Sequence, residues 1–119
     1  MLIRREQFSA LAAPVGTEFV ARLALLLQRH FEDARQAPPD QLRSDINRTI
    51  RRAQAYGLAT ERDAAAFVVT AFLLGENFDN EFPAAQQVLT SPVLGGSDKA
   101  EWLEQWTTQL FQALAPAGE

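Results

Sequence analysis

The segment from residue 61 to residue 76 restricts the fold more than any other part of the chain. Read as a helix, it is apolar on nearly every side, because Thr70 is the only polar residue between Ala64 and Leu74. A helix without a polar face is buried on most of its sides. Thr60 and Asp63 stand near its start at almost the spacing of a capping box. We therefore expect this helix to form the core of a helical domain.

Periodic apolar residues predict two helices ahead of residue 39. A short one over residues 3–13 is ended by Pro14 and Gly16, and its apolar side chains are Ile3, Phe8 and Leu11. A long one begins at the capping residue Thr17 and ends near Gln36. Its apolar face comprises Phe19, Val20, Leu23, Leu25, Leu26, Leu27 and Phe31.

Three more helices are predicted after residue 38. One begins at Pro39, which suits a first helical turn, and stops at Tyr56-Gly57, where glycine favours a left-handed helix end. A short helix is expected over residues 83–90. The last helix should begin at the capping residue Asp98, and its buried stripe comprises Leu103, Trp106, Leu110 and Leu114.

The expected fold class is all-α, a single compact bundle of five or six helices over residues 1–119. Residues 1–15 should form a peripheral segment and residues 115–119 a frayed tail. A chain of 119 residues buries roughly two-thirds of its unfolded surface, so a hydrophobic core can stabilise it. The chain has no cysteine, which excludes disulfides and cysteine-ligated metals, and we expect no cofactor.

Charge and hydropathy narrow the classes of function. A net charge of −4 and a pI near 5 argue against nucleic-acid binding, which needs a basic surface. The N-terminus lacks the apolar region of a signal peptide. The longest apolar run, Ala64 to Gly75, is far shorter than the ~20 residues of a membrane-spanning helix. We therefore expect a cytoplasmic protein without membrane insertion.

The charges are distributed unevenly along the chain. Residues 1–62 hold ten arginines against seven acidic residues, whereas residues 63–119 hold one lysine against eight acidic residues. Arg48, Arg51 and Arg52 lie mostly off the apolar stripe of their helix. Two solvated surfaces of opposite sign would explain this pattern. The alternative is that these arginines steer a charged protein partner.

Catalytic patterns are weak. His30 is the only histidine, and it is expected to be a structural or surface residue. Glu76, Asp79 and Glu81 form the densest carboxylate group, but their spacing does not match an EF-hand loop. Asp79 is expected to cap backbone N–H groups or to be solvated, with a partner contact or a catalytic role as alternatives. We therefore expect no enzyme and no metal site.

Aromatic residues gather in the C-terminal half of the chain, at Phe78, Phe82, Trp102 and Trp106. Most of them should belong to the core. A domain this small has limited capacity to bury them all, and aromatic residues are favoured anchors of protein interfaces. The candidate anchors are Phe78, Phe82 and Trp102, with Asp79 beside them.

Residues 53–84 contain an ordered series of short motifs, which are Ala53–Leu58, Thr60–Asp63, Phe67-Val68, Leu74–Asp79 and Phe82-Pro83-Ala84. This series resembles a family of small helical proteins encoded in bacterial type VI secretion effector clusters, beside spike proteins and adaptor chaperones. Tyr56, Gly57 and Gly75 act in it as a fold signature, because they mark helix ends. The resemblance implies an accessory or co-chaperone role in loading effectors.

Two functions from different classes follow as hypotheses. The first is a protein-binding module whose partner is an adaptor chaperone, an effector toxin or a spike component. The second is an immunity protein that blocks a cognate toxin through its acidic C-terminal half. An enzyme that uses Glu76 and Asp79 is the least favoured reading, and a homodimer through the tryptophan-bearing helix is left open.

Overall fold

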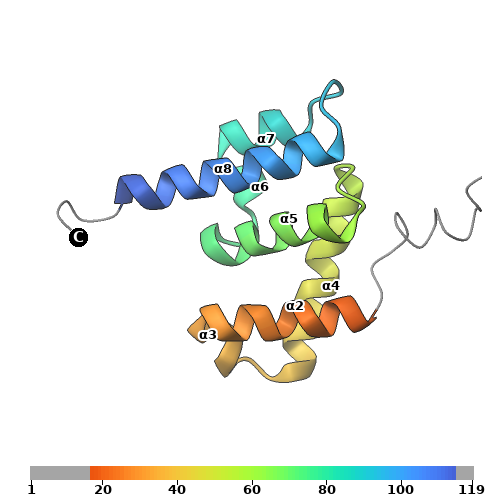
Figure 1. Ribbon diagram of the computed structural model, residues 1–119, viewed down its shortest axis with the longest axis vertical. Helices are drawn as coiled ribbons and strands as arrows, with labels where there is room; N and C mark the ends of the chain where they lie inside the picture. Colours follow the sequence, from red (N-terminus) through yellow and green to blue (C-terminus); the bar gives the residue numbers. More distant parts are fainter. Residues whose placement is uncertain (1–16, 115–119) are drawn as a thin grey trace, which may run out of the picture.

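The computed structural model describes residues 17–114, and side chains are described from residue 18 to residue 110. Helices are the only regular secondary structure in this part of the chain (Figure 1). Its helices are α2 (Thr17–His30), α3 (Glu32–Gln36), α4 (Pro39–Ala55), α5 (Glu61–Leu74), α6 (Phe78–Glu81), α7 (Pro83–Leu89) and α8 (Gly96–Leu114). The predicted helix over residues 3–13, the peripheral segment 1–15 and the tail 115–119 lie outside the described residues.

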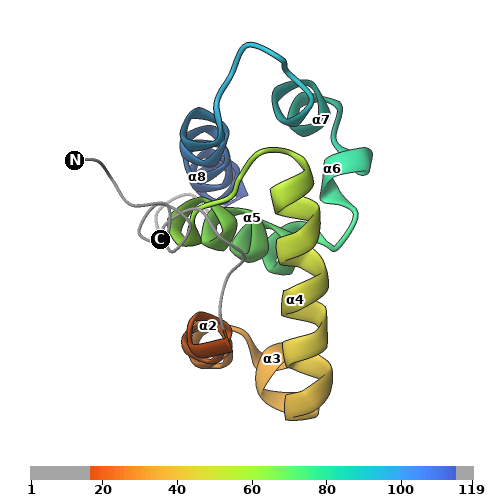
Figure 2. The same cartoon turned by 90° about the vertical axis from the view of Figure 1, so that its right-hand side faces the viewer.

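Helix α5 lies at the centre of the fold, as its apolar sequence predicts. It is stacked between α2 and α8, and α4 crosses α2 and α5 (Figures 1 and 2). It packs against both α8 and α4 and touches α2. Ala64, Phe67 and Val68 of α5 are completely buried in a single hydrophobic cluster to which α2, α4 and α8 also contribute.

The predicted ends of α4 and α5 are confirmed. The hydroxyl of Thr60 accepts a hydrogen bond from the backbone N–H of Asp63 at 3.2 Å, so Thr60 caps α5. Gly57 has φ +94°, and Leu58 N–H donates to the carbonyl oxygen of Ala53 at 2.9 Å, which is the Schellman form of helix end. Gly75 closes α5 with φ +115°.

The first turn of α8 rests on the turn that ends α4. The Nζ atom of Lys99 donates to the carbonyl oxygen of Tyr56 at 2.8 Å and so satisfies a group that the end of α4 leaves free. Gly96 lies so close to Gly57 that a Cβ atom there would overlap the Gly57 carbonyl oxygen. This contact fixes the position of α8 relative to α4 and α5.

The number and bounds of the helices differ from the expectation. Residues 17–114 contain seven helices rather than five or six, partly because Phe31 adopts an extended backbone and separates α3 from α2. Helix α6 adds a four-residue helix that periodicity cannot detect. Asp98 is wrong as the cap of α8, because α8 begins at Gly96 and Asp98 accepts from Gly95 N–H at 3.4 Å from inside the first turn.

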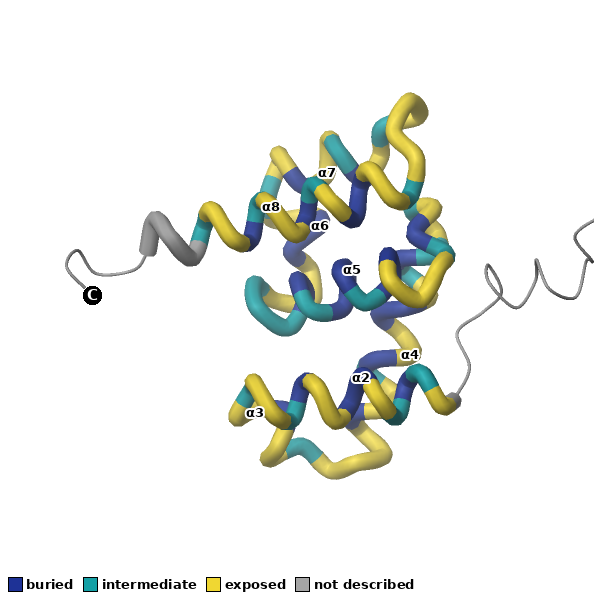
Figure 3. Tube along the Cα trace, viewed as in Figure 1, coloured by how far each residue is buried: buried dark blue, intermediate teal, exposed yellow. Residues whose placement is uncertain are grey.

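Burial follows the contacts between helices (Figure 3). On α2 the expected apolar face is wider than the buried one, because Leu25 and Leu26 are 63% and 41% exposed. Among the described helices, none combines the length and the hydropathy needed to cross a membrane.

Candidate interaction surface

The carboxylate of Asp79 joins α6 to α4. Its Oδ1 atom accepts a hydrogen bond from Arg52 Nη2, and its Oδ2 atom accepts one from the Tyr56 hydroxyl at 2.6 Å. Arg52 also donates to the carbonyl oxygen of Glu76, and its guanidinium carbon lies 5.8 Å from the centre of the Phe67 ring. Asp79 is only 2% exposed. The three side chains of Arg52, Tyr56 and Asp79, which we call the ionic cluster, therefore hold the fold together.

This arrangement corrects two sequence interpretations. Arg52 was expected to lie on a solvated surface or to steer a partner. Asp79 was expected to cap a helix, to be solvated, to touch a partner or to take part in catalysis. Both are instead bound to each other within the fold, where a buried charge needs a partner of opposite sign. The sequence does indicate one part of the ionic cluster, because Arg52 and Tyr56 are four residues apart and share one face of α4. Their partner Asp79 lies 27 and 23 residues further on, which no local pattern reveals.

The ionic cluster shifts two pKa values in opposite directions. Burial raises the pKa of Tyr56 to about 12, and the hydrogen bond to Asp79 adds to this effect because it favours the protonated phenol. For Asp79, burial on its own would raise the pKa. The hydrogen bonds from Arg52 and Tyr56 and the charge of Arg52 outweigh burial, so the pKa of this carboxyl is lowered.

We expect the titration of Tyr56 to report on the ionic cluster directly, because it is the only tyrosine in the chain. Ultraviolet absorbance during an alkaline titration should give a pKa well above 10, approaching about 12. A folded-state pKa that is raised contributes stability that is complete below pH 10 and is lost as the pH rises toward 12. The variant Tyr56→Phe should lack this alkaline loss of stability. A wild-type pKa near 10 would contradict the geometry.

The other two predicted arginines lie on the outer side of α4. The Nε atom of Arg48 donates to Glu76 Oε1 at 2.7 Å, and its Nη2 atom lies 3.0 Å from Asp45 Oδ1. These groups are exposed, so water and salt weaken their interaction. Arg51 is also exposed, and no described residue forms an ion pair with it. Of the three candidates, Arg51 is thus the one left available to steer a partner.

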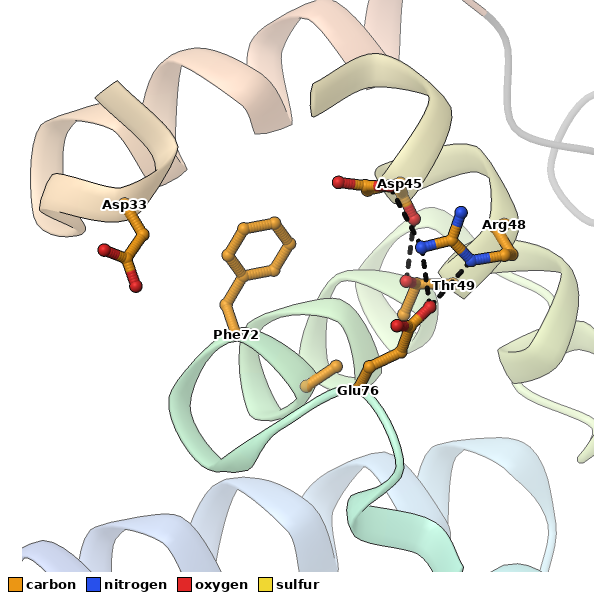
Figure 4. Close-up of a pocket in the computed structure, with 7 residues that line it drawn as sticks. Asp33, Asp45, Arg48, Thr49, Phe72 and Glu76 are labelled. Atoms are coloured by element: carbon orange, nitrogen blue, oxygen red, sulfur yellow. Dashed lines mark hydrogen bonds and ion pairs between the residues drawn. The ribbon is translucent and has the colours of Figure 1, made fainter. Parts of the chain in front are cut away.

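A pocket of about 210 Å³ opens between α3, α4 and α5 (Figure 4). The Phe72 ring lies between the carboxylate of Asp33 and the ion pairs of Arg48. The Thr49 hydroxyl donates its hydrogen bond to the backbone oxygen of Asp45 at 2.7 Å. Its proton is therefore not directed at a side chain that could act as a general base. Within residues 17–114, no group of three or more His, Cys, Asp or Glu side chains is placed to hold a metal ion. The pocket offers charge and an aromatic wall rather than an assembled catalytic group.

Aromatic rings form a continuous row from the core to the surface. Phe78 packs on Phe67 with ring centres 5.0 Å apart, and Trp106 lies 6.4 Å from Phe78. Trp102 stacks on Trp106 at 4.9 Å, and Phe82 meets Trp106 edge-on at 5.3 Å. The outer three side chains are half-buried. We call Phe82, Trp102 and Trp106 the aromatic cluster.

The row separates the candidate anchors into two groups. Phe78 is wrong as an anchor, because it is completely buried beneath Trp106 and belongs to the core. Phe82 and Trp102 do lie together at the surface. Trp106 was predicted to belong to the buried stripe of the last helix, but it is only half-buried and reaches the surface with them. The helical period identifies a shared face of α8, but only the position of α6 decides how far that face is covered.

Comparison of the chain with protein-family models, with curated proteins and with solved structures finds no match. The chain is therefore described by its fold and its surface alone. It is an all-helical domain with a half-buried aromatic cluster and exposed leucines on α2. The signature residues Tyr56, Gly57 and Gly75 stand at helix ends, as expected.

Proposed function

We propose that this chain is a protein-binding module and that its aromatic cluster anchors the partner. The observation that supports this proposal is the accumulation of three large half-buried rings, in which Phe82 and Trp102 each contact Trp106. Tryptophan and tyrosine dominate interface hot spots, because a rigid aromatic ring buries a large area at a small entropic cost. A partner that covers the cluster would complete its burial.

The charges beside the aromatic cluster favour a basic partner surface. Glu81 precedes Phe82 and Glu101 precedes Trp102, and both acidic side chains are exposed. Acidic residues at the rim of an aromatic patch accelerate association with a positively charged partner and disfavour acidic ones. The binding partner is accordingly a protein with apolar side chains surrounded by lysine or arginine.

The resemblance to accessory proteins of type VI secretion extends this proposal to effector loading. In that role the aromatic cluster would hold an adaptor chaperone, an effector or a spike component. The alternative, an immunity protein, is favoured by the same acidic rim, because it would suit a basic toxin. Co-expression of a tagged chain with the products of neighbouring genes distinguishes the two. Recovery of an adaptor supports loading, and recovery of a single toxin in an inactive complex supports immunity.

Replacement of Trp102 by alanine should weaken the complex at least tenfold, since truncation of an interface tryptophan costs ~2 kcal/mol or more. The melting temperature should fall only slightly, because Trp102 lies at the outer end of the aromatic row. Titration calorimetry with the recovered partner measures the first effect, and thermal unfolding the second.

Leu103→Ala provides the matched control on the same helix. Leu103 is completely buried, so its truncation should cost about 2–5 kcal/mol of folding stability. Below its melting temperature this variant should bind the partner with wild-type affinity. If Trp102→Ala bound the partner with wild-type affinity, the aromatic cluster would not be part of the interface.

A further inference from the structure

Helix α2 carries an apolar and basic surface that the described helices leave open. Four large apolar side chains are exposed in the described part of the chain, and Leu25 and Leu26 are two of them. Arg22 and Arg29 lie between these leucines on the helix surface, because each arginine is three or four residues from each leucine. The other side of α2 carries its buried residues, which are Val20, Leu23, Ala24 and Leu27. We call Leu25, Leu26, Arg22 and Arg29 the leucine face.

A pocket opens beside Leu25, between α2 and α4. Its volume is about 270 Å³, and an apolar cavity of about 150 Å³ already holds a benzene molecule. Its apolar lining residues are Ala21, Ala24, Leu25, Pro39 and Leu42. Arg43 is one of the two polar residues in the lining. The pocket can therefore receive the edge of an aromatic ring, with a positive charge beside it.

The leucine face and its pocket carry an excess of positive charge. Arg29 and Arg43 form no ion pair with a described residue. Arg22 lies 3.6 Å from Glu61, but both side chains are exposed, so water weakens their interaction. Residues 17–55 hold seven arginines and five acidic residues, whereas residues 76–110 hold one lysine and six acidic residues. The leucine face accordingly fits an apolar surface with an acidic rim.

The aromatic cluster of the same chain has this chemistry. Trp102 lies at the outer end of its row, and the exposed residues Glu81 and Glu101 flank the cluster in the sequence. Neither acidic side chain forms an ion pair with a described residue. Helices α2 and α8 lie on opposite sides of α5, which keeps the two surfaces apart within one molecule (Figures 1 and 2). The chain thus carries both halves of a contact that only two copies can make.

We propose that the leucine face of one copy binds the aromatic cluster of a second copy. The exposed edge of Trp102 then lies in the mouth of the pocket between α2 and α4, and Glu101 lies beside Arg43. Because this assembly uses the aromatic cluster, it rests on the proposed function, and a further copy competes there with any other partner. A contact built largely from two helices is small, and small interfaces belong to weak and transient complexes.

The contact joins two different surfaces, which determines how the assembly grows. Each added copy leaves one leucine face and one aromatic cluster free, so growth continues beyond a dimer. Sedimentation equilibrium of the full chain from about 10 µM to about 1 mM covers the range of a weak contact. The weight-average mass should rise with concentration past that of a dimer. Added salt should lower this mass, because salt screens the pairs between arginine and glutamate.

Two variants, each with one damaged surface, test which surfaces meet. Leu25→Ser combined with Leu26→Ser removes the leucine face and retains the aromatic cluster, and Trp102→Ala does the reverse. Either variant alone should associate at least tenfold more weakly than the wild type. An equimolar mixture should form a dimer with one copy of each and grow no further, because only the damaged surfaces remain free. Formation of this dimer also shows that both variants are folded.

Reversal of charge tests the predicted neighbours Arg43 and Glu101. Arg43→Glu and Glu101→Arg should each weaken self-association about tenfold, because like charges then meet in every contact. The two changes in one chain should restore it, since opposite charges meet again. Arg51→Glu is the matched control, because Arg51 is an exposed arginine two turns further along α4 and lies outside the leucine face. It should leave self-association unchanged.

Three results would overturn this assignment: a chain that stays monomeric at the highest concentration, a dimer that does not grow further, or no complex in the mixture of variants. A monomeric chain whose Trp102→Ala variant loses the recovered partner would leave the proposed function intact without self-association. Self-association together with wild-type partner affinity in Trp102→Ala would instead assign the aromatic cluster to the second copy alone.

Discussion

Replacement of Gly96 by alanine should destabilise the protein by about 1–3 kcal/mol, the range seen when a tightly packed site is overfilled. The added Cβ atom would overlap the carbonyl oxygen of Gly57 and lie 3.2 Å from its carbonyl carbon. Both atoms are backbone in a Schellman turn, so no flexible side chain can move away. The start of α8 must shift instead, which strains the bond from Lys99 to Tyr56.

Gly95→Ala is the matched control for this prediction. The nearest neighbour of a Cβ atom at position 95 is Asp98 Oδ2 at 4.0 Å, which is an ordinary contact. The same chemical change one residue earlier should therefore alter stability by no more than about 0.5 kcal/mol. Urea denaturation of both variants compares them directly. Equal midpoints for Gly95→Ala and Gly96→Ala would show that α8 does not rest on the Gly57 turn.

The sequence predicts the parts of the fold that depend on local chemistry. Helix α5 is recognisable because its apolar residues cover the whole circumference. Thr60 marks the start of α5, because its hydroxyl accepts a hydrogen bond from a free backbone N–H. Gly57 marks the end of α4, because glycine adopts the positive φ that this helix end requires. The break at Phe31 is missed because nothing in its side chain forbids a helix, and the extended backbone there serves the turn into α3.

The candidate site is less predictable, since it depends on which helix covers which face. The sequence identifies Phe82 and Trp102 as aromatic, but only the position of α6 against α8 leaves them half-buried while it buries Phe78. Leu25 shows the same limit, because it continues an apolar face of α2 beyond the area that other helices cover. Periodicity reports what a helix could bury, and tertiary packing decides how much it does bury.

Replacement of Asp79 by asparagine should cost about 2–3 kcal/mol of stability. Removal of one partner from a buried ion pair typically costs ~3–5 kcal/mol, and the effect is smaller here because the Arg52 side chain is 25% exposed. Asparagine preserves the shape and can still accept from Tyr56, so the loss reports the uncompensated charge of Arg52. Urea denaturation at neutral pH measures it.

The pH dependence should follow the same carboxyl. Its pKa is lowered in the folded state, so its contribution is complete above the ordinary value of 3.8 and is lost as the pH falls through the lowered value. Asp79→Asn should therefore lose less stability than the wild type on acidification below this point. The exposed pair of Asp45 with Arg48 provides the control, and Asp45→Asn should cost about 0.5 kcal/mol or less.

A double variant separates charge from packing in the ionic cluster. If the unpaired guanidinium causes the loss in Asp79→Asn, then the addition of Arg52→Leu should restore part of the stability, because no buried charge is left without a partner. The two changes should thus cost less together than the sum of each alone, by about 1 kcal/mol or more for residues in direct contact. Additive losses would instead mean that Arg52 and Asp79 stabilise the fold separately. The hydrogen bond of Arg52 to the Glu76 carbonyl oxygen and that of Asp79 to Tyr56 would then be the contacts that matter.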